Sequence, residues 1–252
     1  GFLLLDDLGS TTYLARLSPA NAQGLYGAAA EALVRLQLAS RPGVFPEYDA
    51  SLLGRELALF PEWYLGRHRG VQIDAQDAAV LERSFAVLLA NNLAQPKVYV
   101  HRDYHSRNLM VLADSAEPGV LDFQDAVHGP ITYDLVSLLR DAYVSWDEEQ
   151  VLDWAIRYWE RARRAGLPVP DDFGAFYRDF EWMGLQRHLK VLGIFARLCH
   201  RDGKDRYLAD LPLVRHYVMQ VLRRYGEFAP LLDLFERLDP DADGGRQIGY
   251  TF

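Results

Sequence analysis

Three polar residues of this chain have the types and the spacing that phosphoryl transfer requires. Asn108 follows Asp103 by five residues, and Asp122 follows Asp103 by 19 residues. In such a site one carboxylate accepts the proton of an attacking hydroxyl, while an amide and a second carboxylate hold Mg²⁺, an ion that prefers oxygen ligands. A positioned base contributes a rate factor of about 10² to 10⁴. The pattern predicts Asp103 as the general base and Asn108 and Asp122 as the metal ligands.

Short strands must position these residues, because a loop alone is too mobile to fix polar groups within a fraction of an ångström. Apolar β-type runs at residues 98–100 and 109–112 bracket the loop that holds Asp103. A third run at residues 119–121 leads directly into Asp122. The sequence therefore predicts a small β insert that carries the catalytic loop.

Two histidines in the same loop, His101 and His105, have the spacing of a helical zinc pair. Such a pair shares one face only on a helix, and the β-type run directly before His101 argues against a helix. We expect both histidines to support the loop. Asp134 begins a predicted helix, where we expect it to act as a structural cap that can also brace the loop. The alternative is a zinc hydrolase that uses His101, His105 and Asp122, which predicts tightly bound zinc.

The rest of the chain is predicted to be helical, from apolar residues at three-to-four spacing and from capping residues. The expected helices span residues 19–39, 51–60, 75–93, 131–145, 147–164, 171–199, 205–225 and 228–238, with Ser18, Asp49 and Asp74 as N-caps. The segment 171–199 is either one long helix or two broken ones. A loose tail is expected at residues 239–249. The predicted fold class is mainly α (α+β).

The composition indicates a folded globular protein whose main partner is not nucleic acid. Half of the 252 residues are hydrophobic, which allows a sizeable core, and the formal net charge is −8. A nucleic-acid-binding protein needs a concentrated basic surface instead. The one cysteine, Cys199, excludes an internal disulfide framework and fits a reducing compartment. No apolar run approaches the roughly 18 residues of a membrane span, so we expect a cytoplasmic protein without a membrane partner.

Two segments around the loop resemble the aminoglycoside phosphotransferase group of kinase-like enzymes, namely VHRDYHSRNLMV and GVLDFQDAVHGPITYDL. That group shares the protein-kinase fold and phosphorylates small-molecule hydroxyls. Three further stretches resemble a branch of bacterial anomeric sugar kinases acting on N-acetylmuramate and N-acetylglucosamine: LALFPEWYLGRH, LANNLAQPKVYVHRDYHSRNL and GLQRHLKVLGIFARLCHRDGKDRYLADLP. The resemblance implies an amino sugar, ATP and Mg²⁺ as ligands, with the γ-phosphoryl group placed on the anomeric hydroxyl in cell-wall sugar recycling.

The resemblance assigns the same roles to Asp103, Asn108 and Asp122, and it also implies a missing part. The chain has no glycine-rich phosphate loop, and none of its three lysines is expected on a strand before the catalytic loop. A complete member has an N-terminal lobe with a strand lysine that grips the nucleotide phosphates. We therefore expect residues 1–10 to be the last strand and hinge of that lobe, and residues 11–252 to be the C-terminal lobe, which alone should turn over poorly.

The substrate-binding residues are predicted from their surroundings. A sugar pocket needs hydrogen-bonding side chains fixed beside aromatic or apolar faces. Polar residues beside apolar helix faces or directly after the metal site meet this description, and they are Glu56, Gln124, Asp125, Arg187 and His188. N-acetylmuramate carries a carboxylate and should prefer a nearby arginine, for which the candidates are Arg187 and the three residues Arg197, His200 and Arg201.

Two more alternatives are open besides the zinc hydrolase. A kinase of the same fold for an aminoglycoside or an amino alcohol would favour an acidic pocket, because its substrate is cationic. A non-catalytic kinase-like binding lobe would keep its residual activity after Asp103→Asn.

Overall fold

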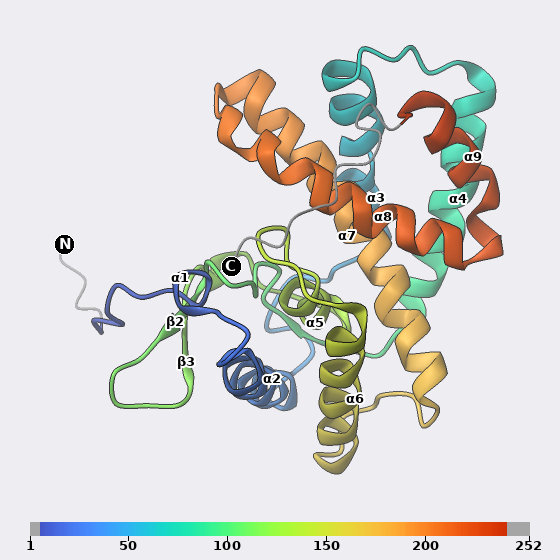
Figure 1. Ribbon diagram of the computed structural model, residues 1–252. Coiled ribbons are helices and arrows are strands. Elements are labelled where there is room, and N and C mark those ends of the chain that lie inside the picture. Colours follow the sequence, from blue (N-terminus) through green and yellow to red (C-terminus); the bar gives the residue numbers. More distant parts are fainter. Residues whose placement is uncertain (1–5, 241–252) are drawn as a thin grey trace.

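The computed structural model describes residues 6–240 as a mainly helical body with two small β ladders (Figure 1). The α-helices and the π-helical segment are α1 (Tyr13–Arg16), α2 (Ala22–Leu38), α3 (Ala50–Leu57), the π-helical η1 (Phe60–His68), α4 (Ala75–Ala94), α5 (Tyr133–Leu139), α6 (Glu148–Arg164), α7 (Phe173–Asp202), α8 (Leu211–Arg224) and α9 (Ala229–Leu238). Short 3₁₀ turns are η2 (Phe123–Asp125), η3 (Asp205–Asp210) and η4 (Gly226–Phe228). The predicted fold class, mainly α with a small β insert, is confirmed.

Two antiparallel strand pairs frame the predicted catalytic loop. Strand β1 (Lys97–Val100) pairs with β4 (Val127–Pro130), and β2 (Leu109–Val111) pairs with β3 (Pro118–Val120). The loop at residues 101–108 therefore leaves one ladder and enters the other. The runs that predict β1, β2 and β3 are confirmed. Strand β4 is absent from the prediction because it contains glycine and proline, which are depleted in strands.

The N-cap predictions are confirmed at two of three helices. The Asp49 side chain accepts a hydrogen bond from the Leu52 backbone N–H at 2.8 Å. The Asp74 side chain caps α4 in the same way, by accepting from the Asp77 backbone N–H at 2.8 Å. The prediction of Ser18 as a cap is wrong, since α2 begins at Ala22. The Asn21 side chain instead accepts from the Ser18 backbone N–H at 2.8 Å, which closes a turn before the helix starts.

Two predicted helices are too long. The helix expected at 131–145 ends at Leu139, because Asp141 turns away to accept hydrogen bonds from the Ser106 N–H at 2.9 Å and the Tyr143 N–H at 3.1 Å. The segment 205–225 divides into η3 and α8. In contrast, α7 is one unbroken helix that closes on Gly203, whose φ of +66° suits glycine.

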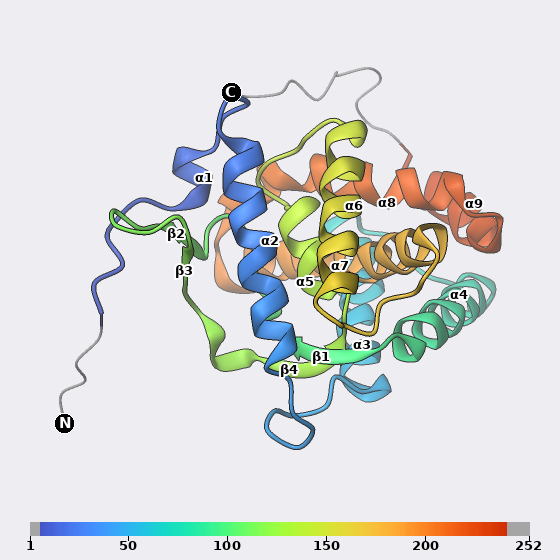
Figure 2. The same cartoon turned by 90° about the horizontal axis from the view of Figure 1, so that it is seen from below.

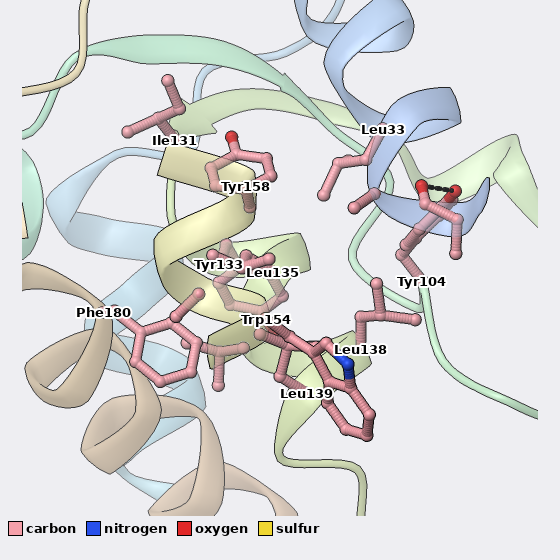
Figure 3. Close-up of a cluster of buried hydrophobic side chains, with 14 of the residues drawn as sticks. Leu33, Tyr104, Ile131, Tyr133, Leu135, Leu138, Leu139, Trp154, Tyr158 and Phe180 are labelled. Atoms are coloured by element: carbon pink, nitrogen blue, oxygen red, sulfur yellow. Dashed lines mark hydrogen bonds between the residues drawn. The ribbon is translucent and has the colours of Figure 1, made fainter. Parts of the chain in front are cut away.

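Helix α7 connects two hydrophobic clusters and so organises the core. Phe176 and Phe180 pack into a first cluster with α2, α5 and α6, and Figure 3 draws Phe180 together with Tyr133 and Leu135 of α5 in this cluster. Further along α7, Leu185 and Leu192 pack into a second cluster with η1, α8 and α9. In Figure 2, α2 and α6 run side by side in front of α5. The predicted loop is thus backed by packed helices.

Helix α7 and η1 approach each other closely at one glycine. A Cβ atom on Gly193 would lie 2.5 Å from the Leu59 carbonyl oxygen and 2.6 Å from the Leu59 Cβ. Only a residue without a side chain fits there.

Within residues 6–240, none of the helices has the length and apolar character to cross a membrane. Of the strand and hinge expected at residues 1–10, residues 1–5 lie outside the described residues, as does the tail expected at 239–249 from residue 241 onward. The prediction of a loose tail is wrong at Asp239, whose buried carboxylate accepts hydrogen bonds from the Tyr64 hydroxyl and from Arg215, each at 2.8 Å.

Candidate active site

Asp134, in the first turn of α5, holds the loop between β1 and β2 through hydrogen bonds to its backbone. The Asp134 carboxylate accepts hydrogen bonds from the backbone N–H groups of His101, at 2.6 Å, and Arg102, at 3.0 Å. Arg102 has a φ of +76°, a left-handed conformation that persists in a non-glycine residue only when its surroundings hold it. Burial raises the pKa of Asp134 to about 7, although the two N–H groups oppose the rise.

Two further contacts fix the same loop. The Tyr104 hydroxyl donates to the Ala29 carbonyl of α2 at 2.8 Å, and Tyr104 is among the buried residues of Figure 3. The Ser106 N–H donates to Asp141 at 2.9 Å. Asp103 lies between these anchors, so its backbone position is set by the helices α2 and α5 behind it.

The structure brings the predicted base and metal ligands together at the edge of the β2–β3 ladder. The Asn108 side-chain N–H donates to the Asp103 carbonyl at 3.1 Å. The Asn108 carbonyl accepts from the Leu121 N–H at 2.9 Å, which places Asp122 beside Asn108. Asp122 has a φ of +69°, the second left-handed non-glycine residue of this site.

These residues fit a Mg²⁺ ion by their donor chemistry. With its amide nitrogen on the Asp103 carbonyl, Asn108 has its side-chain oxygen left for a cation. One Asp122 carboxylate oxygen accepts from the Gln124 side chain at 3.1 Å, which leaves the second oxygen. Mg²⁺ takes one or two protein oxygens of this kind and fills its other positions with water and phosphate.

The two loop histidines occupy different surroundings. His101 is buried edge-on against Tyr104, and burial lowers its pKa while Asp103 and Asp122 oppose the shift. His105 packs edge-on against Tyr143, with ring centres 5.5 Å apart, and burial lowers its pKa too. No group of three His, Cys, Asp or Glu residues in the described part of the chain could hold a metal, and the trio of the zinc alternative does not form one.

Glu56 belongs to a buried charge network behind the loop. Its carboxylate pairs with Arg102 at 2.6 Å and with Lys190 of α7 at 2.8 Å, and it accepts a hydrogen bond from the Tyr48 hydroxyl. Burial favours the protonated acid, but Lys190, Tyr48 and Arg102 together hold the pKa of Glu56 below its usual value. The network orients Arg102, the residue directly before Asp103.

The other predicted substrate residues fall into two groups. Gln124 and Asp125 are exposed in η2, directly after Asp122. Arg187 and His188 are buried on α7, and the His188 Nε2 lies 2.9 Å from the Arg140 carbonyl oxygen. Burial lowers the pKa of His188 to about 3, so its ring is neutral. Substrate contact by any of these residues stays a prediction.

Three residues with clear roles in the site are absent from the sequence prediction. Arg102, Lys190 and Asp141 either complete the network or anchor the loop. Only Arg102 carries a sequence signal, its position directly before the base. The expectation that no lysine lies on a strand before the loop is wrong, because Lys97 is the first residue of β1. Lys97 pairs with Glu47 at 2.7 Å on the surface.

Comparison with known proteins shows the relationship of this chain. A family model described as "Phosphotransferase enzyme family" matches residues 1–167. An N-acetylmuramate/N-acetylglucosamine kinase of Neisseria meningitidis is 52% identical over 256 residues, which cover 100% of this chain and 75% of that protein. A protein of the same name from Pseudomonas aeruginosa is 50% identical over 243 residues, covering 96% of this chain and 71% of the relative.

Two solved structures share the fold at low sequence identity. A choline/ethanolamine kinase family protein from Mesorhizobium loti superimposes with a TM-score of 0.58 and 16% identity, covering 90% of this chain and 71% of that one. The ADP-bound aminoglycoside phosphotransferase APH(2'')-Ib gives a TM-score of 0.51 and 15% identity, with coverage of 84% and 70%.

Proposed function

Because this chain belongs to the phosphotransferase enzyme family, we propose that it is a kinase that transfers the γ-phosphoryl group of ATP to the anomeric hydroxyl of N-acetylmuramate and N-acetylglucosamine. The observation that carries this proposal is the 52% identity, over the whole chain, to a relative named N-acetylmuramate/N-acetylglucosamine kinase. The loop geometry supports it, since it presents one carboxylate as a base beside two oxygen ligands.

Asp103 is the proposed catalytic base. It orients the anomeric hydroxyl and accepts its proton while the new oxygen–phosphorus bond forms and the bond from the γ-phosphorus to the bridging oxygen breaks. ADP is the leaving group, and the product is a sugar 1-phosphate. The hydrogen bonds from the loop backbone to Asp134 and Asp141 fix the position of Asp103. A fixed base favours phosphoryl transfer, because that reaction depends on the positioning of the reacting groups.

Asn108 and Asp122 are the proposed ligands of Mg²⁺. When bound, the ion neutralises charge on the nucleotide phosphates. Gln124 and Asp125 follow the metal position on the surface and are proposed to contact the substrates there. Glu56 is proposed to act through Arg102, which it orients.

We also propose a two-lobe arrangement for the enzyme, in which residues 11–252 form the lobe that binds the sugar and residues 1–10 lead from the nucleotide lobe. Members of this fold grip ATP between two lobes. A role in cell-wall sugar recycling follows from the substrates, since N-acetylmuramate is a cell-wall sugar.

A substrate panel on the full-length enzyme tests the proposed function. ATP and Mg²⁺ are supplied with each amino sugar, an aminoglycoside and an amino alcohol, and the products are analysed by ³¹P and ¹H NMR. We expect an α-1-phosphate of the two N-acetylated sugars. Phosphate on a non-anomeric hydroxyl, or transfer only to the cationic substrates, would contradict the proposal.

A further inference from the structure

Arg187 of α7 is a buried cation for which residues 6–240 supply no ion-pair partner. It is 4% exposed, and its Nε and Nη1 atoms lie in the interior without a hydrogen-bond partner among residues 6–240. The comparably buried Arg140 pairs with Glu181 at 2.8 Å. An unpaired charge in the interior is strongly unfavourable, so the two unpartnered guanidinium nitrogens of Arg187 favour binding of an anion.

Arg187 lies on the stretch of α7 that packs against α5, the helix that anchors the catalytic loop. The next residue, His188, has its Nε2 2.9 Å from the Arg140 carbonyl oxygen, and Lys190 donates to the Tyr133 hydroxyl at 3.0 Å. The charge of Arg187 adds to the lowering of the His105 pKa that burial causes, and it opposes the rise that burial causes in the pKa of Asp134. His105 belongs to the loop, and Asp134 is the residue that anchors it. Asp134 acts on Arg187 only through space: its two oxygens accept from backbone N–H groups, and it makes no hydrogen bond to Nε or Nη1 of Arg187.

Aromatic side chains that pack between the catalytic loop and α7 suit a sugar ring. Tyr143 packs against His105, and Arg107 of the loop lies over the Tyr143 ring at 3.5 Å from its centre. Phe195, two turns along α7 from Arg187, has its ring centre 6.2 Å from that of Tyr143. Arg187 acts electrostatically on Tyr143, so the basic cluster of Arg187 and Arg107 with Tyr143 combines positive charge with an aromatic face.

We propose that Arg187 recognises the carboxylate of N-acetylmuramate and so determines the preference for this acidic sugar over neutral N-acetylglucosamine. The inference rests on the proposed function. N-acetylmuramate is N-acetylglucosamine with a lactyl ether, and the lactyl carboxylate is the one charged group in which the two sugars differ. A guanidinium group matches a carboxylate with two parallel hydrogen bonds, which supplies the partner that the fold does not.

The first experiment compares Arg187→Gln with the parent enzyme. We expect the ratio of kcat/KM for N-acetylmuramate to kcat/KM for N-acetylglucosamine to fall about 10- to 100-fold, the effect of losing a charged hydrogen bond. The matched control is Arg178→Gln on the same helix, because Arg178 is exposed and pairs with Glu227. The control should leave the ratio unchanged.

The second experiment changes the substrate and needs no variant to fold. The methyl ester of N-acetylmuramate, which lacks the charge, should lose a similar factor in kcat/KM with the parent enzyme. With Arg187→Gln, the acid and the ester should be phosphorylated alike.

Three results would overturn the inference. If the parent enzyme does not distinguish acid from ester, Arg187 does not recognise the carboxylate. If Arg187→Gln lowers kcat/KM equally for both sugars, Arg187 acts on the transferred phosphoryl group or on the loop through Asp134. If the parent enzyme phosphorylates neither sugar, the proposed function fails first and the inference falls with it.

Discussion

Asp103 has its position set by hydrogen bonds that its neighbours make. Asp134 binds the backbone on one side of it and Asp141 binds the backbone on the other. At the residue scale this arrangement lets a single side-chain change remove the chemistry without disturbing the loop.

Asp103→Asn tests the base directly. The amide cannot accept the sugar proton, so we expect kcat to fall at least about 10²-fold, with sugar affinity little changed. Turnover and the Kd for the sugar from titration calorimetry are the two measurements. Asp114→Asn, at an exposed aspartate between β2 and β3, is the matched control. Unchanged turnover would favour the non-catalytic binding lobe.

Asp134→Asn tests the anchor and predicts a pH dependence. Burial raises the pKa of Asp134 from 3.8 to about 7, so the fold favours the protonated acid. Its contribution to the free energy of unfolding is therefore fully present below about pH 4 and is lost as the pH rises to about 7. The difference in unfolding free energy between parent and variant should decrease over that range. Denaturant unfolding at a series of pH values measures it, and parallel curves would rule out this titration.

At the element scale, α7 carries residues of both the core and the site. It supplies Lys190 to the Glu56 network and Arg187 to the basic cluster, and it packs on η1 at Gly193. Its placement relative to η1 and α5 therefore decides where these side chains lie.

Gly193→Ala tests that placement. The new Cβ would meet Leu59 backbone atoms that cannot rotate away, so we expect a loss of about 1–3 kcal/mol in unfolding free energy. Gly184→Ala on the same helix is the control, because its Cβ would make an ordinary contact at 3.6 Å with Val136. Alanine is also the better helix former, so the control should be neutral or stabilising in urea unfolding. Equal effects of the two variants would argue against the close approach.

At the scale of the whole molecule, the two hydrophobic clusters share one continuous helix. Phe180 lies in the first cluster and Leu185 in the second, little more than one turn apart on α7. Neither cluster can lose its part of α7 without exposing apolar surface of the other.

This coupling predicts a single unfolding transition. In differential scanning calorimetry the calorimetric and van't Hoff enthalpies should agree, and near-ultraviolet circular dichroism should give the same midpoint. Two resolved transitions would mean that the clusters unfold independently.

Local features of the fold were predictable from the sequence because they depend on neighbours along the chain. The caps at Asp49 and Asp74, and the strands that flank the loop, follow from the residue types within a few positions. The spacing of Asp103, Asn108 and Asp122 is also local, since the loop and one hairpin bring them together. The helix expected at 131–145 was wrong because Asp141 is bound by Ser106, 35 residues away.

Which charges are buried together is decided only by packing. Gln186 meets Glu56 across 130 positions, and Asp134 meets His101 across 33. Such pairs have no local pattern, since they form where helices meet. The roles of Asp103, Asn108 and Asp122 could therefore be proposed from the chain alone. The burial of Arg187 without a partner among residues 6–240 is decided by the packing of α7 against α5, because burial and pairing are properties of the folded surroundings.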